Sequence, residues 1–144
     1  MLAEYERKLF GEPYAELEHR IMAHCGLGRA LTALAERYAD EQLRVIDLAR
    51  AAGMSPTVFR ERFRRTIGIT PRQLLVRYRI KCALHLLSAG HNKISEISER
   101  VGFADVTALE KAFKRTLGAS PSATRKALER LEAPQKQPRA PKIR

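Results

Sequence analysis

The stretch PRQLLVRYRIKCALHLLSA, residues 71–89, joins two copies of one sequence pattern and thereby decides the fold. The copy before it, IDLARAAGMSPTVFRERFRRTIGITP, covers residues 46–71, and the copy after it, SEISERVGFADVTALEKAFKRTLGASP, covers residues 95–121. Three pairs of matched positions are Leu48 with Ile97, Gly53 with Gly102, and Phe63 with Phe113. The offset is 49 before the turn and 50 after it, so the sequence predicts two equivalent units on either side of one linking element.

Each copy reads as a short helix, a glycine turn and a second, more basic helix. Gly53 and Gly102 fit the left-handed residue that commonly ends a helix. Ser55 and Asp105 fit the N-cap of the helix that follows each turn. The segment TPRQ, residues 70–73, is a capping box that opens the linking helix. The expected buried stripe of that helix is Leu74, Leu75, Tyr78, Cys82, Leu86 and Leu87.

Composition favours an all-α protein that binds a polyanion. Aromatic residues are 6%, Trp is absent, and no long alternating run of Val, Ile and Thr occurs, so strands lack their usual pattern. With 27 Lys+Arg against 16 Asp+Glu, the net charge is +11. Residues 44–79 hold nine arginines and two acidic residues, a net charge of +7, so the charge is concentrated on the first copy.

The two ends of the chain differ from its middle. Residues 1–26 carry apolar residues at helical spacing around a Gly-Glu-Pro break, and predict a helical lead-in. This lead-in is interpreted as a linker, the remnant of an upstream domain, or a dimer-forming helix. Residues 27–132 should form the domain proper, with helix-turn-helix units at 45–68 and 94–118 around the linking helix at 71–89. Residues 133–144, with three prolines and four positive charges, predict a disordered basic tail.

A helix, a glycine turn and a basic helix form the helix-turn-helix arrangement. In it the second helix lies in the DNA major groove and the first crosses the backbone. A linking helix of about 18 residues would be about 27 Å long, comparable with the roughly 34 Å between successive major-groove faces. One rigid spacer could therefore present two reading helices to one side of a duplex. Because the two copies differ, the DNA site should be asymmetric and about two helical turns long.

The residues LARAAGMSPTVFRERFRRTIGITPRQLLVRYRI and, in the second copy, SEISERVGF and AFKRTLGASP closely resemble the paired helix-turn-helix domain of the AraC/XylS transcription regulators. The resemblance covers about residues 27–129. It implies an all-α domain of about seven helices, made of two homeodomain-like units, that binds double-stranded promoter DNA. It also implies a bacterial, cytoplasmic regulator, more often an activator that contacts RNA polymerase. Many members carry a separate N-terminal sensor domain, which leaves open a homodimer through an upstream region.

The resemblance also implies which side chains read bases, namely the exposed residues early in the third and sixth helices. These positions are Thr57, Arg60, Glu61, Val106, Thr107, Glu110 and Lys111. Arg60 is the best candidate for bidentate readout of a guanine, with phosphate contact as the alternative. Glu61 and Glu110 could accept from cytosine N4, or could pair with Arg65 and Lys114 on their own helices.

Phosphate contacts are expected from the basic residues that surround these positions. The candidates are Arg44, Arg62, Arg64, Arg65, Arg72, Lys114 and Arg115. The second copy is nearly neutral, so we expect the first copy to anchor the DNA and the second to tune the specificity.

Two other classes of protein compete with DNA binding. Some proteins related to this family join the domain to alkyl-transfer repair by a metal-bound cysteine, but Cys25 and Cys82 lie far apart and the four histidines show no ligand spacing. We therefore expect no enzyme, no metal and no cofactor. A protein-binding helix-turn-helix module, or a nonspecific DNA anchor within a larger regulator, remains the alternative. No apolar run is long enough to span a membrane, and the first residues, MLAEYERKLF, lack the charged-then-apolar order of a signal peptide, so a cytoplasmic protein is expected.

Overall fold

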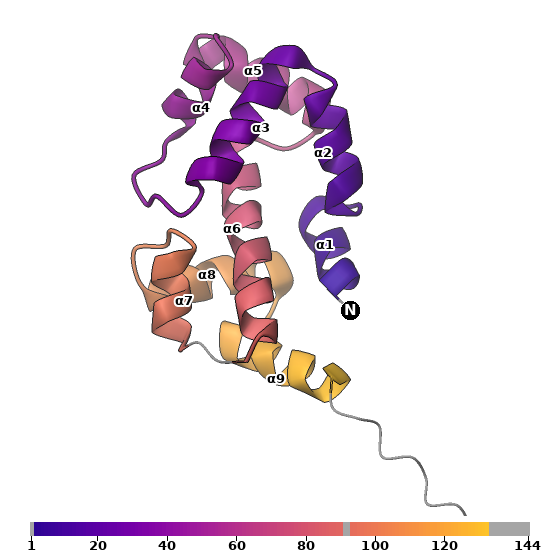
Figure 1. Cartoon of the computed structure of the whole chain (residues 1–144), viewed down its shortest axis with the longest axis vertical. Helices are drawn as coiled ribbons and strands as arrows, with labels where there is room; N and C mark the ends of the chain where they lie inside the picture. The colour runs from indigo at the N-terminus through magenta and orange to yellow at the C-terminus, as the bar shows by residue number, and fades with distance from the viewer. Residues whose placement is uncertain (1, 91–92, 133–144) are drawn as a thin grey trace, which may run out of the picture.

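The structure, a computed structural model, describes residues 2–90 and 93–132, and within these ranges it contains nine helices and no strand (Figure 1). The helices are α1 (Leu2–Phe10), α2 (Tyr14–Met22), α3 (Cys25–Arg37), α4 (Val45–Ala51), α5 (Pro56–Ile67), α6 (Pro71–Ser88), α7 (Ile94–Arg100), α8 (Val106–Leu117) and α9 (Pro121–Glu132). The predicted all-α class is confirmed. The predicted tail at residues 133–144 lies outside the described residues.

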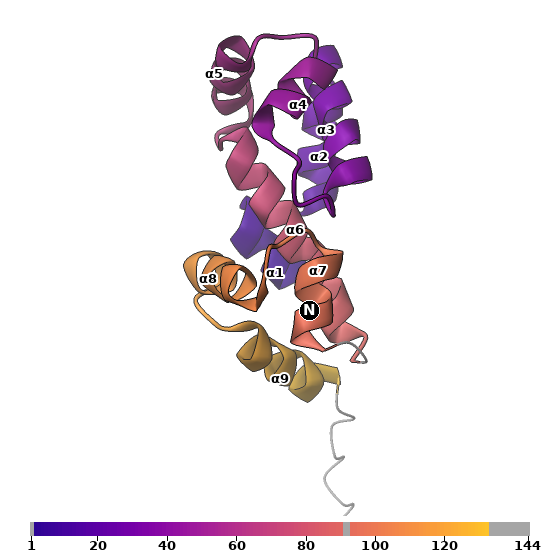
Figure 2. The same cartoon turned by 90° about the vertical axis from the view of Figure 1, so that its left-hand side faces the viewer.

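The long helix α6 connects two groups of helices, as the repeat predicts. One group, at the top of Figure 1, contains α3, α4 and α5, and the other, at the bottom, contains α7, α8 and α9. In Figure 2 the second helices of both units, α5 and α8, which are the predicted reading helices, lie at the same edge of the molecule. The fold thus presents the second helix of each helix-turn-helix unit on one side of a shared spacer.

Each unit has its own hydrophobic core, and the matched positions of the repeat occupy equivalent places in them. Leu48, Phe59 and Phe63 lie in the first core, and Leu109 and Phe113 lie in the second. All five side chains are at most 2% exposed. Burying each large apolar side chain stabilises a fold by about 1.5–3 kcal/mol, so these repeated positions contribute to the stability of both units.

The predicted buried stripe of α6 is wrong in part. Leu74, Leu75 and Leu87 are buried as expected, but the other three expected residues, Tyr78, Cys82 and Leu86, are only partly buried. Buried in their place are Arg79, Ile80, Ala83 and Leu84. The physical reason is that α6 serves two cores: its first turns face the first unit and its later turns face the second. A helix that packs on neighbours on different sides carries no single apolar stripe.

The predicted caps of the helix-turn-helix units are confirmed. Gly53 and Gly102 adopt positive φ values of 70° and 90°. Beyond each glycine the chain turns back on its helix, with Met54 N donating to Ala49 O at 3.0 Å and Phe103 N to Ser98 O at 2.9 Å. The two turns therefore have the same hydrogen-bonded geometry.

The lead-in packs against both units. Leu9 of α1 lies in the second core at 1% exposure, whereas Tyr14, Leu17 and Ile21 of α2 lie in the first core. The Arg77 Nη1 of α6 donates to Leu9 O at 3.0 Å and fixes the end of α1 on the linking helix. These four apolar residues of the lead-in are therefore buried within the chain itself.

Candidate nucleic-acid interface

Local sequence determines which side of α5 faces outward. Ser55 caps the helix, its Oγ accepting from Val58 N at 3.4 Å, and Pro56 occupies the first turn. Phe59 and Phe63 point into the core, with ring centroids 5.6 Å apart. An α-helix has 3.6 residues per turn, so residues on the side of α5 away from Phe59 and Phe63 face solvent. The predicted base-reading residues Thr57, Arg60 and Glu61 are all exposed.

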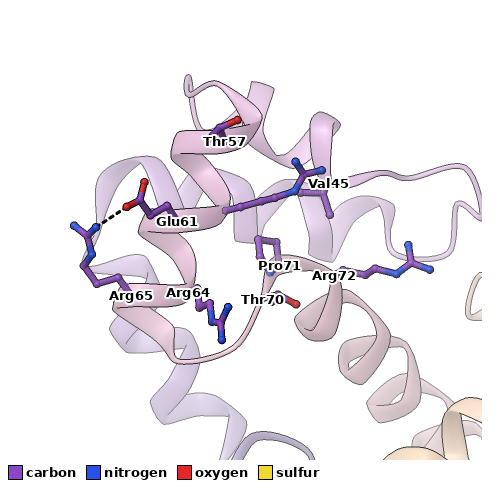
Figure 3. Close-up of a pocket in the computed structure, with 9 residues that line it drawn as sticks. Val45, Thr57, Glu61, Arg64, Arg65, Thr70, Pro71 and Arg72 are labelled. Atoms are coloured by element: carbon purple, nitrogen blue, oxygen red, sulfur yellow. Dashed lines mark hydrogen bonds and ion pairs between the residues drawn. The ribbon is translucent and has the colours of Figure 1, made fainter.

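The exposed side of α5 borders a groove of about 800 Å³, which we call the α5 groove (Figure 3). It lies between α5, the start of α4 and the start of α6. Its lining residues are Val45, Thr57, Arg60, Glu61, Arg64, Arg65, Thr70, Pro71 and Arg72. Four arginines against one glutamate give the lining a strongly positive charge, as a surface for phosphate groups requires.

Glu61 forms the intrahelical pair that the sequence analysis left as one of two alternatives. Arg65 Nη2 lies 3.0 Å from Glu61 Oε1, and both side chains are more than 60% exposed (Figure 3). An exposed i,i+4 pair contributes only about 0.3–0.5 kcal/mol. Such a weak pair leaves Glu61 able to exchange Arg65 for another hydrogen-bond donor.

The reading helix of the second unit is built in the same way with different outward residues. Asp105 caps α8, its Oδ1 accepting from Ala108 N at 2.8 Å, which confirms the predicted capping role. Leu109 and Phe113 are fully buried beneath it. The outward residues Thr107 and Lys111 are exposed, whereas Val106 and Glu110 are partly buried. These four residues do not line the α5 groove.

The predicted phosphate-contacting residues are all exposed, but they do not form one cluster. Arg64, Arg65 and Arg72 line the α5 groove. Arg115 lies with Arg72 on a second groove between α6 and the end of α8. Arg44, Arg62 and Lys114 line neither groove. Arg44 is the N-cap of α4, where its backbone N donates to Asp47 Oδ2 at 2.9 Å.

The linking helix is held against the first unit by a contact that the sequence did not predict. Arg79 of α6 is 8% exposed, and it donates from Nε to Tyr38 O and from Nη2 to Asp40 O, both at 2.8 Å. These two carbonyls lie in the loop that connects α3 and α4. Burial, followed by the nearby charge of Arg72, lowers the pKa of the Arg79 guanidinium from its ordinary value. Arg79 thus joins the linking helix to the first unit.

The turn of the second unit meets the same loop. A Cβ atom placed on Gly102 would lie 2.5 Å from Tyr38 O and 2.9 Å from Arg79 Nε. Gly102 is therefore required both for its positive φ and for this close approach. Because the loop, α6 and the turn meet at one point, this contact helps to set how α8 is oriented relative to α5.

Arg79 was counted in the sequence analysis as one of the nine arginines of the basic segment. It lies between Tyr78 and Ile80 on a helix with otherwise apolar neighbours at i+4 and i+5, Ala83 and Leu84. Arginine is rarely buried unless its guanidinium is paired, and here the two loop carbonyls supply the partners.

The two cysteines lie on different helices and differ in exposure. Cys25 is exposed at the start of α3, and Cys82 is partly buried on α6. In the described ranges no three His, Cys, Asp or Glu residues gather closely enough to hold a metal ion. Burial raises the pKa of the Cys82 thiol above its ordinary value, only partly offset by a hydrogen bond with Tyr38 and by the charge of Lys81.

We expect Cys25 to react with iodoacetamide at pH 8 much faster than Cys82 in the folded protein. The reactive form is the thiolate, and Cys82 is shielded while burial raises the pKa of its thiol. Mass spectrometry of labelled peptides over time measures both rates. In 8 M urea the two rates should converge, and the Cys25→Ser variant should label slowly until it is unfolded. Equal rates in the folded protein would contradict the burial of Cys82.

No helix among residues 2–90 and 93–132 is both long enough and apolar enough to cross a membrane.

Two helix-turn-helix units that expose their second helices along one edge of a shared spacer define a paired helix-turn-helix domain, a class of DNA-binding transcription regulators. A family model described as "Helix-turn-helix domain" matches residues 48–127, more than half of the chain. The chain belongs to the AraC/XylS family of helix-turn-helix transcription regulators. Domains of this family bind DNA and are not enzymes.

Similar proteins come from several bacteria. A putative AraC-like transcription regulator of Streptomyces lividans is 39% identical over 57% of this chain and 27% of its own length. The Msm operon regulatory protein of Streptococcus mutans is 36% identical over 60% of this chain and 31% of its own length. The chain thus spans about 30% of the length of these relatives.

A solved structure shares the fold and more than a third of the aligned residues. It is the DNA-binding domain of AdpA, a global transcriptional factor, in complex with a target DNA. It is 36% identical to this chain, with a TM-score of 0.66, and the likeness covers 74% of this chain and 94% of that one.

Proposed function

We propose that this chain is a sequence-specific regulator of transcription, more specifically an activator, that places α5 and α8 in successive major grooves of an asymmetric promoter site. The observation that carries the proposal is the presence of both reading helices at one edge of the molecule, joined by the 18-residue α6 (Figure 2). At 1.5 Å per residue α6 spans about 27 Å, close to the roughly 34 Å between successive major grooves.

Three features support DNA as the ligand. The α5 groove is lined by four arginines, the charge of the chain is +11, and a related domain was solved with its target DNA. In the proposal Thr57, Arg60 and Glu61 read bases from α5, and Val106, Thr107, Glu110 and Lys111 read them from α8. Arg44, Arg62, Arg64, Arg65, Arg72, Lys114 and Arg115 contact phosphates.

In this proposal the protein acts in the bacterial cytoplasm, where promoter DNA and RNA polymerase are available. Activation would require contact with RNA polymerase. The chain spans about 30% of its relatives' length. If it is part of a longer regulator, a sensor or dimerisation domain would lie in the rest of that regulator.

The first test is selection of binding sequences from a random duplex library at moderate salt. The selected duplex is then titrated against a scrambled duplex at several salt concentrations. We expect one asymmetric site with two conserved blocks about one turn apart, and an affinity that falls steeply with salt. Salt-dependent binding without any enriched sequence would contradict sequence-specific regulation and favour a nonspecific anchor. An apolar contact with a protein partner would show little dependence on salt.

Replacing Arg60 with alanine should relax specificity at one base pair. A bidentate arginine–guanine contact contributes about 1–3 kcal/mol of discrimination, so the preference there should fall about 5- to 150-fold. Titration of duplexes that vary at each position of the selected site measures this. Arg64→Ala is the matched control from the same groove: it should weaken all sequences equally and reduce the salt slope by about 1. If Arg60→Ala kept full discrimination, the assignment of Arg60 would be wrong.

A further inference from the structure

A second basic groove, which we call the spacer groove, lies between the two reading helices. It has a volume of about 400 Å³ and is formed by α1, the first half of α6 and the end of α8. Its lining residues are Lys8, Thr70, Arg72, Gln73, Val76, Arg77, Arg115 and Thr116. Four of these eight residues are cationic and none is acidic, so the groove is built for an anion.

The spacer groove continues the surface that carries the proposed DNA contacts. Thr70 and Arg72 line both this groove and the α5 groove. At its other end, Arg115 and Thr116 belong to the last turn of α8. A positive surface therefore runs without a break from one reading helix, across the start of α6, to the other.

The lead-in helix α1 is held where its Lys8 can contribute to this groove. Leu9 is 1% exposed in the second core, and its carbonyl accepts from Arg77 Nη1 at 3.0 Å. Lys8 is exposed, and its Nζ lies 5.7 Å from the centroid of the Tyr5 ring on the same helix. Its position is thus determined by the packing of its neighbour.

Two acidic residues near α1 are engaged elsewhere and do not neutralise the groove. Glu6 Oε2 accepts from Tyr14 N at 3.2 Å, and Glu12 pairs with Arg20 at 2.9 Å. Both interactions hold carboxylates on the α1–α2 connection. Glu4 lies one turn before Lys8 on α1 but does not line the spacer groove, so the only charged residues in its lining are cationic.

We propose that the spacer groove binds the phosphodiester backbone of the duplex between the two major grooves, and that Lys8 of the lead-in supplies a phosphate contact there. This rests on the proposed function, in which α5 and α8 enter successive major grooves on one side. Between two such grooves the backbone crosses the face of the duplex that looks toward the protein. A duplex held by both helices brings those phosphates to the surface that joins them, where Lys8, Arg72 and Arg115 lie. The lead-in is then part of the DNA-binding surface.

The test compares Lys8→Ala with Arg37→Ala in the full chain, using the duplex selected from the random library. Arg37→Ala removes the same charge from the end of α3, which lies at the edge opposite α5 and α8 (Figure 2). Losing one phosphate contact should lower affinity on the order of three- to tenfold at about 0.1 M salt and reduce the salt slope by about 0.9. Lys8→Arg should restore both values. Circular dichroism checks that all variants remain folded, as expected for exposed side chains.

A second arm locates the contact on the DNA. Single phosphates between the two conserved blocks are replaced by neutral methylphosphonates, and each duplex is titrated with the parent chain and with Lys8→Ala. When the contacted phosphate is neutralised, the parent should bind more weakly than it binds the unmodified duplex. Lys8→Ala, which already lacks the contact, should bind the two duplexes with nearly equal affinity.

The outcomes separate the inference from the proposed function. If the parent selects no site, both are overturned. If the parent binds its site but Lys8→Ala matches Arg37→Ala in affinity and salt slope, only the role of Lys8 and the spacer groove is overturned. If the affinity losses from Lys8→Ala and from the methylphosphonate add at every phosphate position, the Lys8 contact is likewise overturned.

Discussion

Replacing Gly102 with alanine should lower the free energy of unfolding by about 3 kcal/mol. Two costs combine: a non-glycine residue in the left-handed region costs roughly 1–2 kcal/mol, and crowding in a packed site costs about 1–3 kcal/mol. The crowding is against backbone, because the added Cβ would lie 2.5 Å from Tyr38 O. Since a backbone carbonyl cannot rotate away as a flexible side chain can, the loop between α3 and α4 must move.

Gly118→Ala is the matched control, and urea denaturation measures both variants. Gly118 also has a positive φ, 75°, but no atom lies within 4 Å of a Cβ placed there. It should show only the conformational cost, about 1–2 kcal/mol. If Gly102→Ala were no less stable than Gly118→Ala, the close approach of the two units at Gly102 would be wrong.

Replacing Arg79 with methionine should cost about 2–4 kcal/mol of stability and loosen the geometry of the two reading helices. Hydrogen bonds from a charged donor contribute about 1.5–3 kcal/mol each, and Arg79 makes two of them at 2.8 Å. The substitution also removes the free-energy cost of burying the charged guanidinium, and this offsets part of that sum. Methionine keeps most of the aliphatic packing, so the loss reports mainly on the two carbonyls.

The stability control for Arg79 is Arg37→Met. Arg37 pairs with Asp40 at 3.2 Å on the surface, where such a pair contributes at most about 1 kcal/mol. The second readout uses the selected duplex and one with a single base pair inserted between its two blocks. The parent should discriminate strongly between them, and Arg79→Met should discriminate less. If Arg79→Met changed neither the stability nor the discrimination between the two duplexes, Arg79 would not be a positioning residue.

The repeat made most of the fold predictable. Phe59, Phe63, Leu109 and Phe113 recur at helical spacing, and a buried stripe at that period leaves few alternatives to a helix on a core. The caps were predictable for an equally local reason, since Ser55 bonds only to groups within a few residues of itself. The paired domain and its reading helices follow from such local rules.

The linking helix shows where local rules stop. Its expected stripe assumed one buried side, but α6 packs on two cores, so Ile80 and Leu84 are buried and Tyr78 is not fully so. The period of a helix indicates which residues share a side, and it does not say how many neighbours the helix will have.

Sequence alone determined that this chain is all-α, that it contains two helix-turn-helix units on one spacer, and which side of each reading helix faces outward. Tertiary structure alone decided that Arg79 is buried and bonded to the α3–α4 loop, and that Gly102 contacts Tyr38. It also decided that Lys8 lines a groove whose other lining residues are more than sixty positions away in sequence. The physical reason is range. Helix period and capping act within a few residues, whereas these three contacts depend on how separate helices pack, which no local pattern encodes.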